Sequence, residues 1–261
     1  MKCWKDLGSE ISNACGLLQL PIENLLPCPS IEPWWHPEGI EFHPSLNRPV
    51  SRETPPSLKL QITMETIRSL PPADYIVYTD GSATNAEKCG SGALIINVNT
   101  EEEHSLSHPA GNFGSSFRAE SVALLHALTW LKLHQAQGNI RILTDSKSLV
   151  VDLAAGVNKT KSNLRDNIWT HLKDLSANDR TIIIQWIPGH CGLPGNESAD
   201  RLANIGSLMD QSGIQIDYLS AKAKVKRYIK EVVLRPRLVH YSQPDGLRPP
   251  PQRDKEKGLT R

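Results

Sequence analysis

The stretch Ile187-Pro-Gly-His-Cys-Gly-Leu-Pro-Gly-Asn-Glu-Ser-Ala-Asp200 joins a predicted strand to a predicted helix. It follows the apolar run Thr181-Ile-Ile-Ile-Gln-Trp-Ile187, whose length and β-branched side chains are typical of a buried strand. A Pro-Gly pair ends that strand, and a helix is expected from about Asn196. The connection therefore carries a titratable side chain at each end, His190 and Asp200. Taken alone, the pattern also fits an ordinary strand–loop–helix connection with a surface histidine and an aspartate that offsets the helix dipole.

Upstream of this stretch, the apolar pattern alternates between strand and helix. Three strands in succession are expected, followed by helices that alternate with further strands. This order predicts an α/β fold, a mixed sheet with helices on its faces. The predicted strands cover residues 75–79, 91–98, 104–108, 140–144 and 181–187, and the predicted helices cover 115–133, 146–155 and 163–175 as well as the helix from 196.

The two ends of the chain differ from this patterned centre, residues 71–209. Residues 1–70 contain nine prolines and no sustained apolar period, which predicts a Pro-rich, partly ordered segment with a short helix near 64–70. Residues 210–261 are expected to form a basic helix and a disordered tail. Seven basic residues and one acid lie between Lys222 and Arg237, a pattern that is more often a solvated helix face than a nucleic-acid-binding helix.

Composition excludes several classes of protein. No apolar run approaches the roughly 18 residues of a membrane span, and the N-terminus lacks the order of a secretory signal. The five cysteines are scattered and form no C-x-x-C pair, which argues against a disulfide framework or a zinc site and favours an intracellular protein, in the nucleus or the cytoplasm. Net charge is −2 for residues 1–70, −3 for 71–201 and +6 for 202–261, which gives the total of +1. An acidic centre that acts on a polyanion needs a metal ion or this basic flank.

Four carboxylates occupy positions that suggest one site. Asp80 and Asp145 each follow a predicted strand, and parallel neighbouring strands would bring both to the sheet edge where ligands usually bind. Glu120 lies about one turn into the first long helix, and Asp200 lies in the helix after the Gly-rich loop. Taken singly, each acid also fits a turn, an N-cap or a dipole-compensating position.

Converging carboxylates repel one another unless cations compensate their charge. Hard oxygen ligands without cysteine or paired histidine select Mg²⁺, with Mn²⁺ able to substitute, over zinc. Two such ions about 4 Å apart form the clamp that serves phosphoryl transfer.

These motifs also carry a family resemblance. Tyr-Thr-Asp80-Gly-Ser, Arg-Ala-Glu120, Thr-Asp145-Ser and Trp-Ile-Pro-Gly-His190-x-Gly-x-x-Gly-Asn-Glu-x-Ala-Asp200 together resemble the type 1 ribonuclease H family. The residues of the last motif are most similar to those in the ribonuclease H domains of non-LTR retrotransposon polyproteins. The resemblance covers roughly residues 73–208, and its acidic positions occur in order with fitting spacing.

The resemblance implies a five-stranded mixed sheet, three antiparallel strands and then parallel ones, and endonucleolytic cleavage of the RNA strand of RNA–DNA hybrids. It implies that Asp80, Glu120, Asp145 and Asp200 hold two Mg²⁺ ions and that His190, flanked by glycines, carries a proton as product leaves. Hybrid selectivity in this family comes from 2′-hydroxyl contacts and groove shape. The candidates for those contacts are Asn85, Ser115 and Ser116.

The chain departs from the family pattern in the basic, Trp-bearing helix of some members, which is reduced here to Lys159, Lys161 and Arg165. Residues 1–70 are similar to the connection that follows reverse transcriptase in such elements, which implies a reverse transcriptase domain encoded upstream as a partner. We expect a monomer without membrane contacts. Two alternatives stay open, a catalytically idle nucleic-acid-binding remnant and a DNA-acting nuclease of the same fold.

Overall fold

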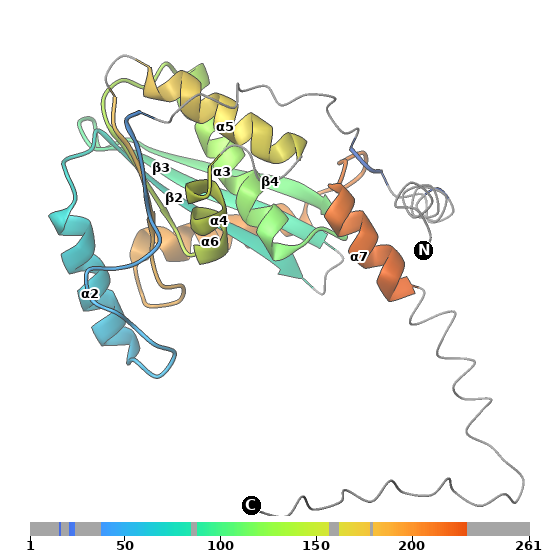
Figure 1. The fold of residues 1–261 in the computed structure, drawn as a ribbon, viewed down its shortest axis with the longest axis horizontal. Coiled ribbons are helices and arrows are strands. Elements are labelled where there is room, and N and C mark those ends of the chain that lie inside the picture. The colour runs from blue at the N-terminus through green and yellow to red at the C-terminus, as the bar shows by residue number, and fades with distance from the viewer. Residues whose placement is uncertain are drawn as a thin grey trace, which may run out of the picture.

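The structure is a computed structural model that describes residues 38–84, 88–156, 162–177 and 180–228, together with residues 16 and 21–23. Its centre is a six-stranded sheet in the order β1-β6-β5-β2-β3-β4, covered by helices (Figure 1). The strands are β1 Ile40–His43, β2 Tyr75–Thr84, β3 Lys88–Asn97, β4 Glu103–Asn112, β5 Ile140–Thr144 and β6 Ile182–Trp186. The helices are α2 Pro56–Ser69, α3 Ser116–Leu133, α4 Lys147–Ala154, α5 Asn163–Ser176, α6 Pro194–Leu208 and α7 Tyr218–Tyr228. Within the described ranges, no helix combines the length and apolar character needed to cross a bilayer.

The sheet is mixed, as the sequence predicts. Strands β2, β3 and β4 pair antiparallel, whereas β2, β5, β6 and β1 pair parallel. The expected number of five strands is wrong, because β1 adds a sixth strand beside β6. Ile40 pairs with Ile182, so a four-residue strand from the Pro-rich segment depends on a partner far along the chain.

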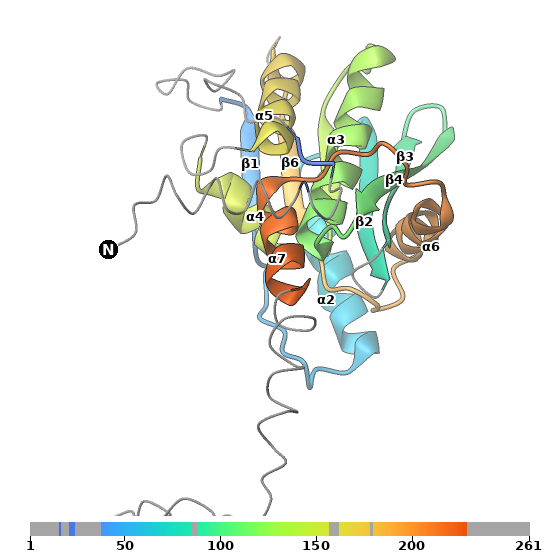
Figure 2. The ribbon, with the colours of Figure 1, turned by 90° about the vertical axis from the view of Figure 1, so that its right-hand side faces the viewer.

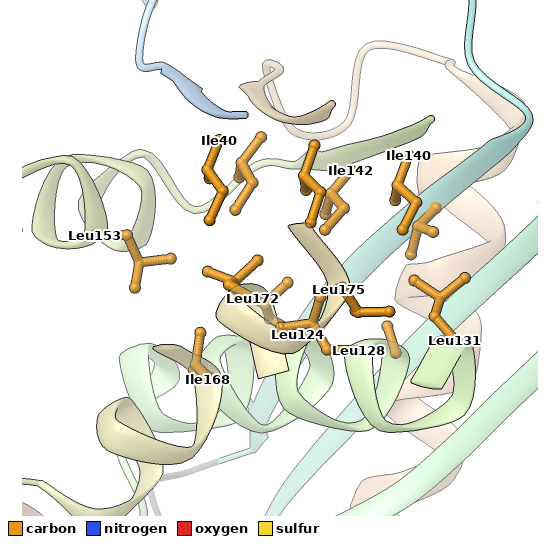
Figure 3. Packing of buried hydrophobic residues seen from close by; sticks show 14 of the residues in the cluster. Ile40, Leu124, Leu128, Leu131, Ile140, Ile142, Leu153, Ile168, Leu172 and Leu175 are labelled. Atoms are coloured by element: carbon orange, nitrogen blue, oxygen red, sulfur yellow. The ribbon is translucent and has the colours of Figure 1, made fainter. Parts of the chain in front are cut away.

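The main apolar core lies between the sheet and helices α3, α4 and α5. All five residues of β5 are buried, which suits a central parallel strand whose two faces are both covered. Figure 3 shows the β5 side chains Ile140 and Ile142 facing a layer of helix side chains from α3, α4 and α5. The labelled helix residues in this layer are Leu124, Leu128, Leu131, Leu153, Ile168, Leu172 and Leu175.

Helix α6 packs very closely on the sheet because β3 has glycines beneath it. A Cβ atom at Gly92 would lie 2.3 Å from the backbone oxygen of Ala199, and one at Gly90 would lie 2.1 Å from that of Ala203. No side chain fits at either glycine without separating helix and sheet. The Ser107 hydroxyl in β4 donates a 2.6 Å hydrogen bond to the backbone oxygen of Leu202. This packing fixes the height of α6, and hence of Asp200, over the sheet.

Helix α2 lies outside the patterned centre yet contributes a second apolar cluster. Leu60 and Met64 of α2 pack against Leu143 of β5 and against Cys191 and Leu193 of the loop before α6. The helix begins at Pro56, earlier than the expected short helix near 64–70, because proline is well tolerated in the first turn. The segment before residue 71 therefore supports the sheet and the Gly-rich loop.

Candidate active site

Asp80 and Asp145 lie side by side because β2 and β5 are parallel neighbours in register. Thr79 pairs with Thr144, and each aspartate is the next residue along its strand. The expected placement of both at one sheet edge is confirmed. The backbone oxygen of Asp145 accepts a 3.1 Å hydrogen bond from the indole nitrogen of Trp186, which ties this edge to β6.

The first strand is predicted to end at Thr79, whereas β2 continues through Asp80-Gly81 to Thr84. The reason is the approach of helix α3. A Cβ atom at Gly81 would lie 2.3 Å from the backbone nitrogen of Glu120, so only glycine lets the helix come this close. The glycine of the Asp-Gly pair therefore serves helix packing instead of a turn.

Glu120 is brought to the edge by the start of α3. Ser115 is the N-cap residue, and its hydroxyl accepts a 3.1 Å hydrogen bond from the backbone nitrogen of Arg118. Glu120 is only 8% exposed, and its Oε2 atom has no hydrogen-bond partner in the part of the chain that the structure describes. A buried carboxylate oxygen without a partner is costly, and a bound cation would satisfy it.

The three carboxylates form one compact group. Within the described part of the chain, carboxylate oxygens of Asp80, Glu120 and Asp145 all lie within 4.8 Å of one another. Burial, followed by the charge of Asp145, raises the pKa of Asp80 to about 7. The same two causes raise the pKa of Glu120 well above its usual value, and burial raises the pKa of Asp145. A divalent cation would offset the repulsion between these buried carboxylates.

Asp200 lies beside this group without belonging to it. Its side chain forms a hydrogen bond with Asp80, and its charge raises the pKa of both Asp80 and Asp145. It is half-buried in α6, whereas the other three acids come from β2, α3 and the end of β5. The structure thus gathers all four sequence-predicted acids, three closely and one at the margin.

His190 is exposed in the loop before α6 and has a left-handed backbone, with a φ of 51°. Its charge lowers the pKa of Asp145, partly opposing the dominant effect of burial. A Cβ atom at Gly189 would lie 2.5 Å from Oδ2 of Asp145, so that glycine permits close approach of the loop. Gly192, at a φ of 86°, has the left-handed conformation that favours glycine. The neighbouring Cys191 is buried, so the loop is anchored next to its exposed histidine.

Asn196 is the site residue that sequence reasoning missed. It is 2% exposed at the start of α6, and its side chain hydrogen-bonds to Asp145 and lowers the pKa of that aspartate. Its Oδ1 atom has no partner within the described residues. The signal that could have found it is the asparagine of the Gly-Asn-Glu motif, which contributes to the family resemblance but for which no role in the site is predicted.

The structure describes only two of the three residues predicted to contact the substrate. Ser115 and Ser116 are both exposed at the start of α3, whereas Asn85 lies outside the described residues. Of the expected basic helix residues, Lys159 and Lys161 also lie outside them. Arg165 is buried, and its guanidinium donates a 2.7 Å hydrogen bond to the carboxylate of Asp152. That contact joins α5 to α4, so Arg165 has a structural role.

The sheet is mixed, and a cluster of carboxylates lies at the edge where its parallel strands end. These features define an α/β domain with a candidate metal site. Residues 72–207 match the RNase H family. The chain belongs to the RNase H family.

Individual relatives agree with that assignment. The chain is similar to the "Ribonuclease H" of Polynucleobacter asymbioticus, 30% identical over 141 residues that cover 50% of this chain and 88% of the relative. It is also similar to the "Ribonuclease H" of Pseudomonas aeruginosa strain LESB58, 30% identical over 142 residues that cover 50% of this chain and 91% of the relative.

Two solved structures were also matched. One is the N-terminal RNase H domain of rv2228c from Mycobacterium tuberculosis, with 24% identity, a TM-score of 0.41 and coverage of 51% of this chain and 98% of that one. The other is RNase H1 from the archaeon Halobacterium salinarum, with 21% identity, a TM-score of 0.41 and coverage of 51% and 96%.

Proposed function

We propose that this chain is an endoribonuclease that hydrolyses the RNA strand of RNA–DNA hybrids with the help of two divalent cations. Membership of the family and relatives named for this activity support the proposal. The observation that carries it is the compact group of Asp80, Glu120 and Asp145, whose oxygens lie within 4.8 Å of one another. The buried Oε2 atom of Glu120, which has no partner among the described residues, fits a carboxylate cluster that binds a cation.

Asp80, Glu120, Asp145 and Asp200 would hold two Mg²⁺ ions, and Mn²⁺ could replace them. All-oxygen donors suit hard divalent cations. When bound, two such ions supply an activated water and stabilise the charge on the leaving oxygen.

The remaining site residues orient groups and move protons. Asn196 forms a hydrogen bond with the Asp145 carboxylate, which holds that ligand in one orientation. His190 is exposed near Asp145, where it can take up and release a proton as the cleaved strand departs. The hydroxyls of Ser115 and Ser116 are available for contacts to the substrate backbone.

A narrower origin is part of the proposal. The wording of the motif from Trp186 to Asp200 and the Pro-rich segment before residue 71 support derivation from a non-LTR retrotransposon polyprotein. In that setting a reverse transcriptase domain is encoded upstream, and the protein acts inside the cell as a monomer.

The test is cleavage of a labelled RNA–DNA hybrid beside RNA–RNA and DNA–DNA duplexes, with Mg²⁺ and with EDTA. We expect metal-dependent cutting of the RNA strand of the hybrid only, and its loss in Asp145→Asn. The matched control is Asp174→Asn, which makes the same change in an exposed ion pair with Lys132 and should retain activity. Hybrid binding without cutting would favour the idle remnant, and cutting of duplex DNA would favour the DNA-acting nuclease.

Metal binding needs a readout of its own. A rise in melting temperature on addition of Mg²⁺ or Mn²⁺, absent in Asp145→Asn and present in Asp174→Asn, would support the ion site independently of cleavage.

A further inference from the structure

Helix α7 lies beyond the residues that match the family, yet it is docked on the start of α3. Asp217 caps α7, because its carboxylate accepts hydrogen bonds from the backbone nitrogen of Ser220 at 2.9 Å and from its hydroxyl at 2.7 Å. The same carboxylate lies 3.5 Å from Nη1 of Arg118, in the first turn of α3. Ala221 and Val225 are buried. The orientation of α7 is therefore fixed relative to the helix that carries Glu120.

A further contact joins α7 to the turn before α3. The Lys224 ammonium lies over the Phe113 ring, 3.6 Å from its centroid. Phe113 is two residues before Ser115, the N-cap residue of α3. In Figures 1 and 2, α7 lies beside the first turns of α3, at the end of the molecule where β2 finishes. The helix thus lies at the end of the sheet toward which β2 continues after Asp80 (Figure 1).

The charge of α7 has one sign. Its sequence, Tyr218-Leu-Ser-Ala-Lys-Ala-Lys-Val-Lys-Arg-Tyr228, contains no acid. Lys222 and Lys226 are four residues apart and so share one face of the helix. Among the described residues, neither forms an ion pair. This stands in contrast to Lys132, whose ammonium pairs with Asp174.

The candidate active site offers no net attraction for a polyanion. Two divalent cations balance the charge of four carboxylates without exceeding it, so an attractive field has to come from basic side chains outside the site. Arg165 of α5 does not supply that charge, because its guanidinium is already paired with Asp152. Helix α7 carries positive charge at the same end of the fold, next to the exposed hydroxyls of Ser115 and Ser116.

We propose that α7 is a second nucleic-acid contact, which binds the phosphate backbone of the substrate where it leaves the carboxylate edge over the start of α3. This inference rests on the proposed function for the identity of the substrate. Its recognition is electrostatic and independent of base sequence, because contacts from lysine ammonium groups to phosphates carry no information about the bases.

The experiment compares two double variants of the full chain that change charge equally. Lys222→Gln/Lys226→Gln removes two charges from α7, and Lys132→Gln/Lys173→Gln removes two from the far ends of α3 and α5. Lys224 is kept so that its contact with Phe113 remains. Binding of a long labelled RNA–DNA hybrid is measured against salt concentration in the Asp145→Asn background, so that no cleavage intervenes. Thermal melting checks that both variants fold.

For the α7 variant we expect weaker binding, with the slope of log K against log salt reduced by about 1 for each lysine. The control variant should keep the slope of the parent. With the catalytic site restored, the α7 variant should show a raised KM on the long hybrid, and unchanged kcat and KM on a short hybrid that covers only the carboxylate edge. Equal slopes in the α7 variant and its control would overturn the proposal and identify α7 as a solvated face.

The two proposals fail in different ways. Absence of cleavage on any substrate, with the α7 slope difference intact, would overturn the proposed activity and leave α7 as a nucleic-acid contact. Cleavage with equal slopes would do the reverse.

Discussion

The two halves of the candidate site are built in opposite ways. Asp80 and Glu120 belong to secondary structure, are 6% and 8% exposed, and have pKa values raised by burial. His190 belongs to a loop, is exposed, and has a left-handed backbone. The buried half stores unfavourable charge that a cation can relieve, whereas the exposed half leaves a titratable group free to meet solvent and substrate. On the proposed function, the first half would serve charge stabilisation and the second would serve proton movement.

The support of the two halves also differs. The buried acids are placed by strand register and by the approach of α3 at Gly81. The loop is held from beneath by α2, which precedes the matched residues, because Leu60 and Met64 pack in the cluster that contains Cys191. A segment outside the family match thus supports the part of the site that lies on a loop.

The largest expected effect is on the buried half. Glu120→Gln removes one charge from the carboxylate group and should lower the cleavage rate by about a thousandfold or more, because metal-assisted charge stabilisation is worth several kcal/mol. Without metal, the variant should melt at a higher temperature than the parent, since a buried like charge is gone. Hybrid cleavage and thermal melting in EDTA measure the two effects. Glu103→Gln, an exposed change at the start of β4, should alter neither.

The buried carboxylates should give the stability of the protein a characteristic dependence on pH. The folded-state pKa of Asp80 is raised from 3.8 to about 7, so the folded protein holds its proton more tightly than the unfolded chain does. The free energy of unfolding in EDTA should therefore fall as pH rises from about 4 to 7. Mg²⁺ should restore more stability at pH 8 than at pH 5.

Denaturant melts at several pH values, with EDTA and with Mg²⁺, test this expectation. His126 contributes the opposite trend, because burial lowers its pKa from 6.5 to about 4 and stability is lost as pH falls through that range. Asp80→Asn is the matched comparison, since it removes only the first trend. A stability that falls equally with pH in Asp80→Asn would contradict the assignment.

The exposed half should show a smaller effect that depends on turnover. His190→Ala should lower steady-state cleavage by about tenfold to a hundredfold, within or below the usual range for a positioned proton carrier. A single-turnover measurement should show a smaller loss if the histidine acts as product leaves. The variant should melt like the parent because the side chain is exposed. Equal losses in both kinetic regimes would place its action in the chemical step.

The smallest expected effect concerns the support of the loop. Leu60→Ala should cost about 1–3 kcal/mol of stability, because the leucine is partly buried in the cluster with Cys191 and Leu193. Cleavage should fall only a few-fold, in the same kinetic regime as His190→Ala. Leu58→Ala is the control on the same helix, since Leu58 is 39% exposed and outside the cluster. Equal stability and equal cleavage rates in the two variants would show that Leu60 of α2 does not support the loop.

Sequence reasoning succeeded where the signal is local. The apolar runs before Asp80 and Asp145 are strongly patterned, and the inference that two parallel strands bring those acids to one edge is confirmed by their register. Family membership at residues 72–207 confirms the resemblance at the level of the family. The roles of the four acids and of His190 stay predictions.

Sequence reasoning failed where structure depends on distant partners. Strand β1 has only four residues, and its pairing with Ile182–Gln185 leaves no local periodicity to detect. The predicted strand ends at Thr79, before Gly81, because the close approach of Glu120 that gives this glycine its role is a tertiary contact. Asn196 escaped for the same reason, since its hydrogen bond to Asp145 joins the start of α6 to the end of β5.

The pairing of β1 with β6 has a consequence for how the chain is made. Ile40 leaves the ribosome long before Ile182, so β1 has no partner until nearly all of the matched domain has been synthesised. Closing so long a loop is slow relative to forming the β2–β3 and β3–β4 hairpins, which pair nearby residues. Until β6 emerges, the nascent chain exposes an unpaired strand and the apolar face of α2. A growing chain should therefore be most prone to aggregation, and most in need of chaperones, just before its last strand arrives.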